Sequence, residues 1–268
     1  MERISSRQNS HFKLARKLAV SPRERVKASQ ILIEGTRLIQ SYSDCFGLLE
    51  STLLVSDSGA LRPDIRRVLD TVPSRNTYVL TDALFKEITQ VETPEGIAAI
   101  SGTPEVASKA FDDFRIFLDG VQEPGNLGSL LRTAAAAGAT SAHLAKGCTD
   151  AWSPKALRGG MGAQFLLPIH ENVDLESALT GFDGRIIATS AHAQTAIYDT
   201  DLTGPVAMMF GNEGRGLPEA VLSLANQLVH IPMVGKMESL NVAAAAAVCC
   251  FERLRQVVRV GAGGDSKK

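Results

Sequence analysis

The sequence lacks the usual signatures of secreted, zinc-binding or membrane-spanning proteins. It contains four cysteines, Cys45, Cys148, Cys249 and Cys250, and none of them forms a Cys-x-x-Cys pair. Neither a disulfide framework nor a zinc site is indicated, so we expect a reducing, cytoplasmic location. No apolar run reaches the roughly 18 residues of a membrane span, and the N-terminus has no apolar signal core. We therefore expect neither a membrane nor a metal partner.

A strong net charge is also missing, but the charge is unevenly distributed. The formal net charge is −1, which does not by itself indicate nucleic-acid binding. Residues 1–40 nonetheless carry nine Lys and Arg residues against three Glu residues, which makes this end a candidate surface for a polyanion. On charge alone, a solvated helix face explains the excess equally well. The candidate RNA contacts are Arg7, Lys13, Arg16, Lys17 and Arg37.

The first block, residues 1–101, alternates short predicted strands and helices. A basic amphipathic helix is predicted at "HFKLARKLA", and further helices are predicted from Thr36, at "DIRRVLDT" and at "DALFKEI". Strands are predicted at "QILIEG", "STLLVSD", "TYVL" and "GIAAIS". This alternation favours a small α/β domain. Residues 102–113, "GTPEVASKAFDD", are polar and lack a period, so they are the predicted linker.

The second block, residues 114–260, predicts an open, mostly parallel α/β sheet. Its strands are apolar runs at "FRIFLDGV", "SAHLAK", "FLLPIH", "RIIATSA", "VAMMFG" and "LVHIPM", as in strands covered on both faces. Helices are expected at residues 127–137, at "DLESAL", after Pro218 and at about residues 239–258. The stretch with Pro154 and "RGGMGA" reads as irregular, and residues 261–268 as a disordered tail.

Ligands of open α/β sheets bind beyond the carboxyl ends of the strands, and three loops there carry unusual residues. In "LDGVQEPGNLGSLLRTA", Gly125 and Gly128 permit close approach to a ligand. Asn126 can cap the helix that follows, and Arg132 is an isolated cation in an Ala/Leu helix. A plain cap and an ion pair with a distant acid remain alternatives for these two residues.

The second and third loops are similarly marked. In "MMFGNEGRGLPEAVL", the glycines have the spacing GxxGxG, so the dinucleotide pattern GxGxxG is absent, as is the P-loop pattern. Three glycines around Glu213 favour a ligand loop over a plain turn. In "HIPMVGKMESLNVAAAAAVCCFE", Ser239 is the predicted N-cap of the last helix and Asn241 falls in its first turn. The alanines that follow leave room for close packing.

Taken together, these loops resemble the three motifs of the SpoU/TrmH-type RNA 2′-O-methyltransferases of the SPOUT superfamily. The motifs read "GNLGSLLRTAAAAGA", "FGNEGRGLP" and "IPMVGKMESLNVAAAAAV", in the family's order, and the resemblance covers about residues 114–252. The segment "SPKALRGGMGAQFLLPI" is similar to the family's intermediate region, although Gly159 and Gly160 replace commoner small residues and are expected to loosen it. Residues 1–101 resemble the small substrate-binding domain of many of these enzymes, which is related to a ribosomal-protein RNA-binding fold.

The resemblance implies a fold, a cofactor and partners. It implies a deep trefoil knot in the second domain, a homodimer, and S-adenosylmethionine as methyl donor. The matching cofactor-binding positions are Gly211, Ile231, Met233, Leu240 and Asn241. The methyl group would pass to a ribose 2′-hydroxyl of RNA, with 23S rRNA favoured over tRNA. A catalytically inactive RNA-binding homologue and a base-modifying enzyme are the alternatives.

The catalytic positions that the resemblance implies are Arg132, Asn126, Glu213, Ser239 and Asn241. A guanidinium group is a poor base, so we expect Arg132 to orient the ribose or a phosphate and to stabilise the developing alkoxide. Asn126 would position Arg132 or the substrate, and Glu213 would pair with Arg132. Ser239 and Asn241 would order the cofactor loop and the ribose.

Overall fold

The computed structural model describes residues 1–268 apart from residues 73, 108–112, 236, 238 and 265–268. The chain forms two compact units, Met1–Glu105 with Trp152–Phe165, and Val106–Ala151 with Leu166–Lys268. The predicted boundaries differ from these in two respects, because the sequence places residues 152–165 in the second domain and the predicted linker, residues 102–113, is divided between the two units. Residues 152–165 join the first unit since Leu157 and Phe165 are buried in its core. Residues 108–112 of the predicted linker lie outside the described residues.

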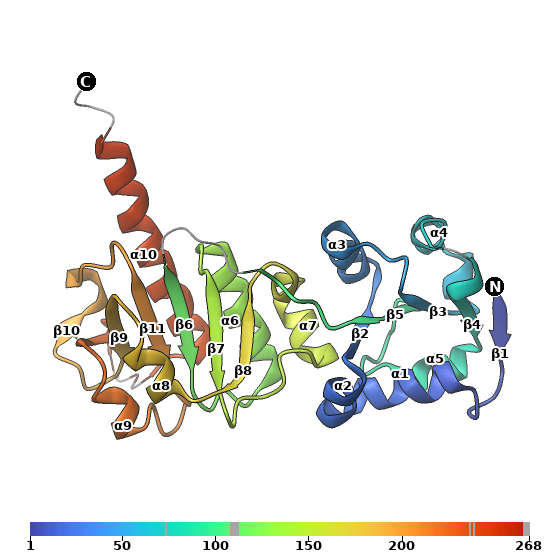
Figure 1. The fold of residues 1–268 in the computed structure, drawn as a ribbon, viewed down its shortest axis with the longest axis horizontal. Coiled ribbons are helices and arrows are strands. Elements are labelled where there is room, and N and C mark those ends of the chain that lie inside the picture. Colours follow the sequence, from blue (N-terminus) through green and yellow to red (C-terminus); the bar gives the residue numbers. More distant parts are fainter. Residues whose placement is uncertain (73, 108–112, 236, 238, 265–268) are drawn as a thin grey trace. The chain divides into compact units, whose positions relative to one another are not determined.

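The sheet of the first unit has five strands in the order β1-β4-β3-β5-β2 (Figure 1). These are β1 (Glu2–Ile4), β2 (Gln30–Glu34), β3 (Thr52–Ser56), β4 (Thr77–Leu80) and β5 (Ile97–Gly102). Strands β1, β4 and β3 run parallel, and β5 is antiparallel to both β3 and β2. The helices are α1 (Ser10–Val20), α2 (Pro22–Ala28), α3 (Thr36–Phe46), α4 (Pro63–Leu69), α5 (Asp82–Ile88) and α7 (Pro154–Gly160). The sequence did not predict β1, α2 or α7.

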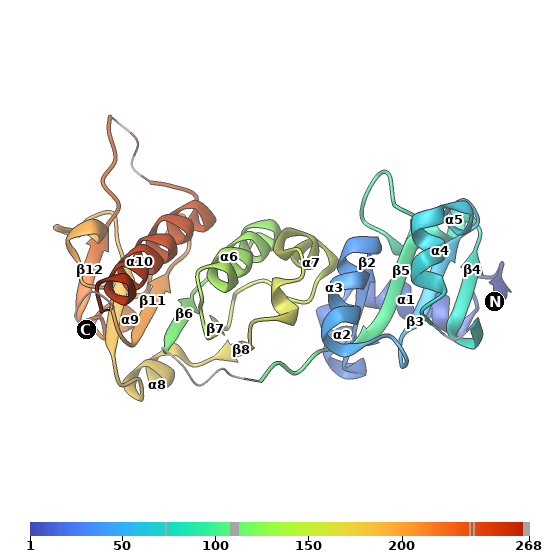
Figure 2. The ribbon, with the colours of Figure 1, turned by 90° about the horizontal axis from the view of Figure 1, so that it is seen from above.

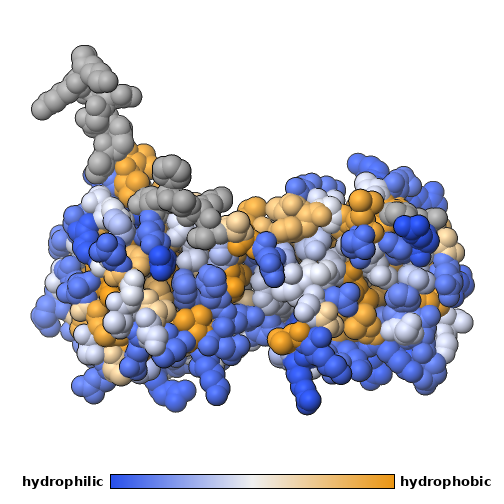
Figure 3. All heavy atoms as spheres, viewed as in Figure 1, coloured by the Kyte–Doolittle hydropathy of each residue, from blue (hydrophilic) through white to orange (hydrophobic). Residues whose placement is uncertain are grey.

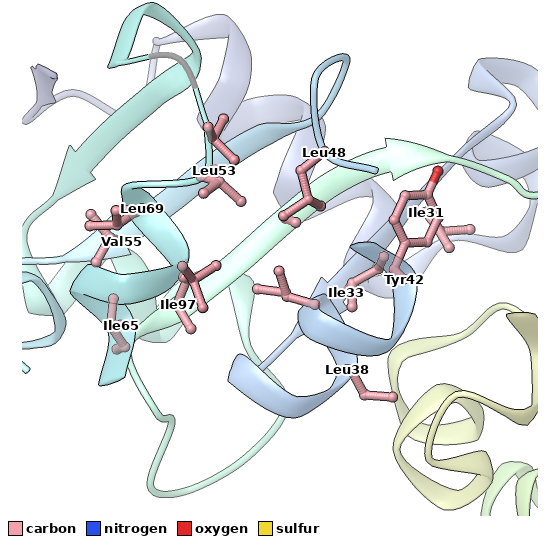
Figure 4. Packing of buried hydrophobic residues seen from close by; sticks show 14 of the residues in the cluster. Ile31, Ile33, Leu38, Tyr42, Leu48, Leu53, Val55, Ile65, Leu69 and Ile97 are labelled. Carbon is pink, nitrogen blue, oxygen red and sulfur yellow. The ribbon is translucent and has the colours of Figure 1, made fainter. Parts of the chain in front are cut away.

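Alternation along the strands builds one core on each face of this sheet. Ile31 and Ile33 of β2 contribute to the cluster beneath α3 and α4, shown in Figure 4. Leu32, between them, contributes to the cluster beneath α1 and α5, which contains Phe12 and Phe85. Because side chains of a strand alternate between faces, this hydrophobic run is buried on both sides and the unit has three layers.

A buried ion pair ties α7 to β2 within the first unit. Arg158 Nη1 donates to Glu34 Oε2 at 3.0 Å, and the Glu34 side chain is 8% exposed. Thr89 Oγ1 donates to the same oxygen at 3.0 Å. Burial raises the pKa of the Glu34 carboxyl, and Arg158 opposes that rise. The carboxylate therefore depends on Arg158 for its charge compensation.

Gly160 has a packing role rather than the loosening effect expected from the sequence. It lies at the end of α7, and a Cβ there would come within 2.2 Å of Gln164 Oε1. The Gln164 side chain is fully buried and donates to the Ala156 carbonyl at 3.0 Å. A larger residue at 160 would displace this buried amide, so glycine lets α7 pack closely.

The sheet of the second unit has seven strands in the order β10-β12-β9-β11-β6-β7-β8. These are β6 (Phe114–Leu118), β7 (Ser141–Ala145), β8 (Ile169–Val173), β9 (Arg185–Thr189), β10 (Thr195–Ala196), β11 (Val206–Phe210) and β12 (Gln227–His230). Every pairing in it is parallel, which confirms the predicted parallel α/β sheet. The short edge strand β10 was not predicted.

Helices cover both faces of this second sheet (Figure 2). Helices α8 (Leu175–Thr180) and α9 (Glu219–Leu222) pack on the face that carries Phe117 and Met209. On the other face α10 (Val242–Gly264) places the Arg253 guanidinium 4.4 Å from the Phe114 ring centroid, and α6 (Pro124–Ala136) lies beside α10.

Helix α10 ends later than the sequence predicts. It continues through Gly264, so the expected disordered tail is wrong for residues 261–264, while residues 265–268 lie outside the described residues. Three of these four residues are glycines, which are poor helix formers, so local propensity favours the earlier end that the sequence predicts. Within the described residues, every helix is too short or too polar to span a membrane.

We expect Arg158→Ala to lower the free energy of unfolding by about 1–3 kcal/mol, because it leaves the Glu34 carboxylate buried without a charge partner. Urea denaturation measures this change. Arg3→Ala is the matched control, because Arg3 pairs with Asp57 at 2.7 Å but its side chain is 63% exposed. The control should change stability by less than about 0.5 kcal/mol. Equal effects of the two substitutions would contradict the buried-pair interpretation.

Candidate active site

The loops after β6 and β11 meet at one edge of the second sheet. The two strands are parallel neighbours with Leu118 opposite Phe210, and the Asp119 amide donates to the Phe210 carbonyl at 3.0 Å. A cavity of about 340 Å³ opens there. Its lining consists of Gly120, Val121, Gln122, Glu123, Asn126, Gly211, Asn212, Glu213, Gly214 and Val242. Since Val242 begins α10, the third motif also reaches this cavity.

Glu213 connects the three predicted motifs. Its Oε1 accepts hydrogen bonds from Asn126 Nδ2 at 2.7 Å and from Asn241 Nδ2 at 2.9 Å. These residues come from the segments that follow β11, β6 and β12 respectively. Both donors are neutral amides, so they orient the carboxylate without neutralising its charge. The sequence predicted all three residues as catalytic but not this arrangement.

Asn126 is not a helix cap. Helix α6 begins at Pro124, three residues before the predicted start, and its N-cap is Glu123, whose Oε1 accepts from the Gly125 amide at 3.1 Å. Proline favours the first helical position because its missing N–H is not needed there. Asn126 therefore lies within the first turn, with its amide directed to Glu213.

Asn241 is the N-cap of α10, the role predicted for Ser239. Its Oδ1 accepts from the amides of Ala243 at 3.0 Å and Ala244 at 3.3 Å. Ser239 is exposed and precedes the helix. Asn caps a helix as well as Ser does, and it has a second polar group to spare. Asn241 uses its oxygen for the cap and its nitrogen for Glu213, so it links helix position to the site.

Arg132 lies exposed on α6. The predicted ion pair with Glu213 is wrong, because within the described part of the chain Arg132 forms no ion pair and Glu213 accepts from two asparagines instead. The guanidinium is therefore available to a ligand outside the protein.

The predicted cofactor positions are only partly gathered by the structure. Gly211 lines the cavity, and Asn241 donates a hydrogen bond to the lining residue Glu213. Ile231 is half-buried, whereas Met233 and Leu240 are exposed, and none of the three is among the described lining residues. A Cβ on Gly211 would lie 2.3 Å from the Gly216 carbonyl carbon, so the closed loop requires glycine there.

Four of the five predicted RNA contacts lie on or beside α1. Lys13, Arg16 and Lys17 are exposed on this helix, and Lys17 pairs with Glu24 at 3.1 Å. Arg7, just before α1, makes a bidentate contact with Glu87, from Nε to Oε2 and from Nη2 to Oε1. Arg37 lies instead on α3, which packs on the opposite face of the sheet.

Sequence reasoning missed Gly120, Glu123 and Asn212, which line the cavity, and Asp119, which directly precedes Gly120. Gly120 has φ +65°, and the "DG" pair directly after a buried strand was the available signal for a tight turn. Burial raises the pKa of the Asp119 carboxyl, and the Arg215 charge opposes this rise. No sequence pattern distinguished Asn212 from an ordinary loop residue.

The parallel α/β sheet is the architecture that the motifs imply for an RNA methylase, and its loops bring residues of all three motifs together at one cavity. Residues 113–251 match the SpoU rRNA Methylase family, and residues 9–99 match the MRM3-like substrate binding domain. The chain belongs to the SpoU methylase family.

Relatives extend this match over nearly the whole chain. The Bacillus subtilis 23S rRNA (guanosine(2553)-2′-O)-methyltransferase RlmP is 31% identical, over 94% of this chain and 98% of its own length. A Streptomyces viridochromogenes 23S rRNA (uridine(2479)-2′-O)-methyltransferase is 29% identical, over 95% and 92%. The structure of the SpoU methyltransferase AviRb from that organism, in complex with AdoMet, superposes with a TM-score of 0.83 at 28% identity, covering 94% of this chain and 99% of AviRb.

We expect Asn241→Ser and Asn241→Ala to separate the two roles of Asn241. Serine keeps an N-cap acceptor but cannot reach Glu213. The free energy of unfolding of the Asn241→Ser variant should therefore stay near that of the unsubstituted protein. Alanine removes both contacts and should lower the free energy of unfolding by about 1 kcal/mol. Thermal and urea denaturation measure the difference. Equal stability of the two variants would contradict the capping role.

Proposed function

We propose that this protein transfers a methyl group from S-adenosylmethionine to a ribose 2′-hydroxyl of 23S rRNA. The observation that carries the proposal is the Asn126–Glu213–Asn241 cluster, which joins the three family motifs at one cavity. The two full-length relatives named above methylate 23S rRNA, one at a guanosine and one at a uridine. The proposal therefore concerns the RNA and the ribose oxygen, and leaves the base open.

The polar groups that line the cavity fit the cofactor. Two carboxylates, Glu123 and Glu213, line it together with the backbone of Gly120, Gly211 and Gly214, and no cation is among its described lining residues. Such a site suits a ligand with a positive charge and hydroxyl groups. S-adenosylmethionine supplies an electrophilic methyl group on a sulfonium when bound. Gly211 would hold it from the cavity lining, and Ile231, Met233, Leu240 and Asn241, which are not among the described lining residues, would hold it from the segment between β12 and α10, mainly through backbone groups.

Arg132 would act on the ribose oxygen. A neutral hydroxyl must lose its proton as it attacks, and a guanidinium with a pKa above about 12 cannot remove that proton efficiently. An exposed, unpaired cation can instead stabilise the negative charge that develops on the oxygen, and can hold a neighbouring phosphate. Glu213 holds Asn126 near the start of the same helix, which orients the helix that carries Arg132.

We expect Arg132→Ala to lower kcat by about 100-fold or more, the effect of removing one group that stabilises a developing oxyanion. Cofactor affinity should change less than about threefold, because Arg132 is outside the cavity lining. Methyl transfer to rRNA and calorimetric binding of S-adenosylmethionine measure the two effects. Arg132→Lys is the control that keeps the charge but loses the planar donor. Retained turnover in the alanine variant would remove Arg132 from the chemistry.

The first unit would dock the RNA through α1, where Lys13 and Arg16 are exposed and form no ion pair within the described residues. We expect Lys13→Ala with Arg16→Ala to weaken rRNA binding and to reduce the slope of log K against log salt by about 2. Arg66→Ala with Arg67→Ala is the matched control, because these exposed cations lie on α4, on the opposite face. Filter binding at several salt concentrations measures the rRNA affinity and its salt dependence for both double variants. Equal losses from the two pairs would contradict docking through α1.

We also propose the knot, the homodimer and the cytoplasmic location that the resemblance implies. The exposed apolar residues of α10 support a dimer surface: Phe251 is 48% exposed and Val258 is 60% exposed. Apolar atoms of α10 are visible beside the grey C-terminal residues in Figure 3. A cytoplasmic location follows from a substrate that is assembled into ribosomes there.

A further inference from the structure

Asn212 makes contacts in two directions from the loop after β11. Its Nδ2 donates to the Gly120 carbonyl, in the loop after β6, at 2.8 Å. Its Oδ1 accepts from the amides of Gly214 at 2.9 Å and Arg215 at 3.1 Å. The nitrogen thus joins two loops, while the oxygen closes the turn that holds Glu213. Its backbone also exchanges both hydrogen bonds with Gly216, at 3.1 and 2.8 Å.

The loops after β6 and β11 approach each other closely at Gly120 and Asn212. Gly120 has φ +65°, and a Cβ built on it would lie 3.3 Å from the Asn212 Cβ. The glycine therefore lets the Asn212 side chain approach the β6 loop, and the amide fixes it there. Only an amide of this length supplies a donor for the carbonyl and an acceptor for the turn at the same time.

The position of this link determines what it controls. Asn212 precedes Glu213 directly, and Gly120 lies six residues before Asn126. Glu213 Oε1 lies 2.7 Å from Asn126 Nδ2 while it also accepts from Asn241. A shift of the β11 loop relative to the β6 loop would break the first of these contacts. The spacing that Asn212 holds is thus the spacing on which the cluster depends.

We propose that Asn212 is a positioning residue for methyl transfer, which fixes the separation of the two loops so that Glu213 contacts Asn126 and Asn241 together. This rests on the proposed function. It assigns Asn212 no contact with the RNA or the cofactor; it acts through Glu213.

Asn212→Ser and Asn212→Asp test the link, because each keeps an acceptor for the turn and removes the amide donor to Gly120. Their agreement excludes an effect of charge alone. We expect each to lower kcat about tenfold to a hundredfold, as a small misplacement of a site does, with cofactor affinity within about threefold of the original. The loss should shrink to less than about twofold when Glu213→Ala is already present, because the acceptor for Asn126 and Asn241 is then absent.

Hydrogen exchange of the peptide 119–127 gives a readout that needs no activity. Both Asn212 variants should speed exchange in this peptide and leave strand β9 unchanged. An undiminished kcat loss in the Glu213→Ala background, or unchanged exchange of 119–127, would overturn the proposal. If the unsubstituted protein methylates no rRNA, the proposed function fails, and the exchange result alone still decides whether Asn212 fixes the loops.

Discussion

One carboxylate oxygen, Glu213 Oε1, accepts two amide hydrogen bonds, and the arrangement of the second unit makes both possible. Strands β6 and β11 are parallel neighbours, so the segments after them share an edge of the sheet. Helix α10 packs beside α6 and begins at its cap, Asn241, which brings a third segment to the same place. The Asn126–Glu213–Asn241 cluster is thus a consequence of sheet order and of one helix start.

Charge is divided between the cavity and its surroundings. Carboxylates of Glu123 and Glu213 line the cavity, whereas Arg132 is exposed outside the described lining. An RNA phosphate is repelled by the first group and attracted by the second. This division suits the proposed function, in which a cationic cofactor binds inside the cavity and the RNA backbone binds outside it. Under the proposed function, the exposed cations of α1 in the first unit attract the RNA without a role in the chemistry.

The sequence predicted most elements and the three motifs because apolar runs and glycine loops are local signals. It misplaced the starts of α6 and α10, because Glu123, Asn126, Ser239 and Asn241 are all plausible caps and tertiary partners decide among them. The predicted ion pair between Arg132 and Glu213 is wrong for the same reason, because the Glu213 carboxylate accepts from two asparagine amides instead. Residues 152–165 could not be assigned to the first unit, because the hydrophobicity of Leu157 and Phe165 does not say which core they enter.

The central claim is most directly tested by transfer of a labelled methyl group from S-adenosylmethionine to rRNA prepared from cells that lack this protein. The account predicts label in 23S rRNA, at a nucleotide whose 3′ phosphodiester resists alkaline cleavage because its 2′-hydroxyl is methylated. Label found on a base, and not on a ribose, would contradict it. So would the absence of label in 23S rRNA while the protein still binds the cofactor.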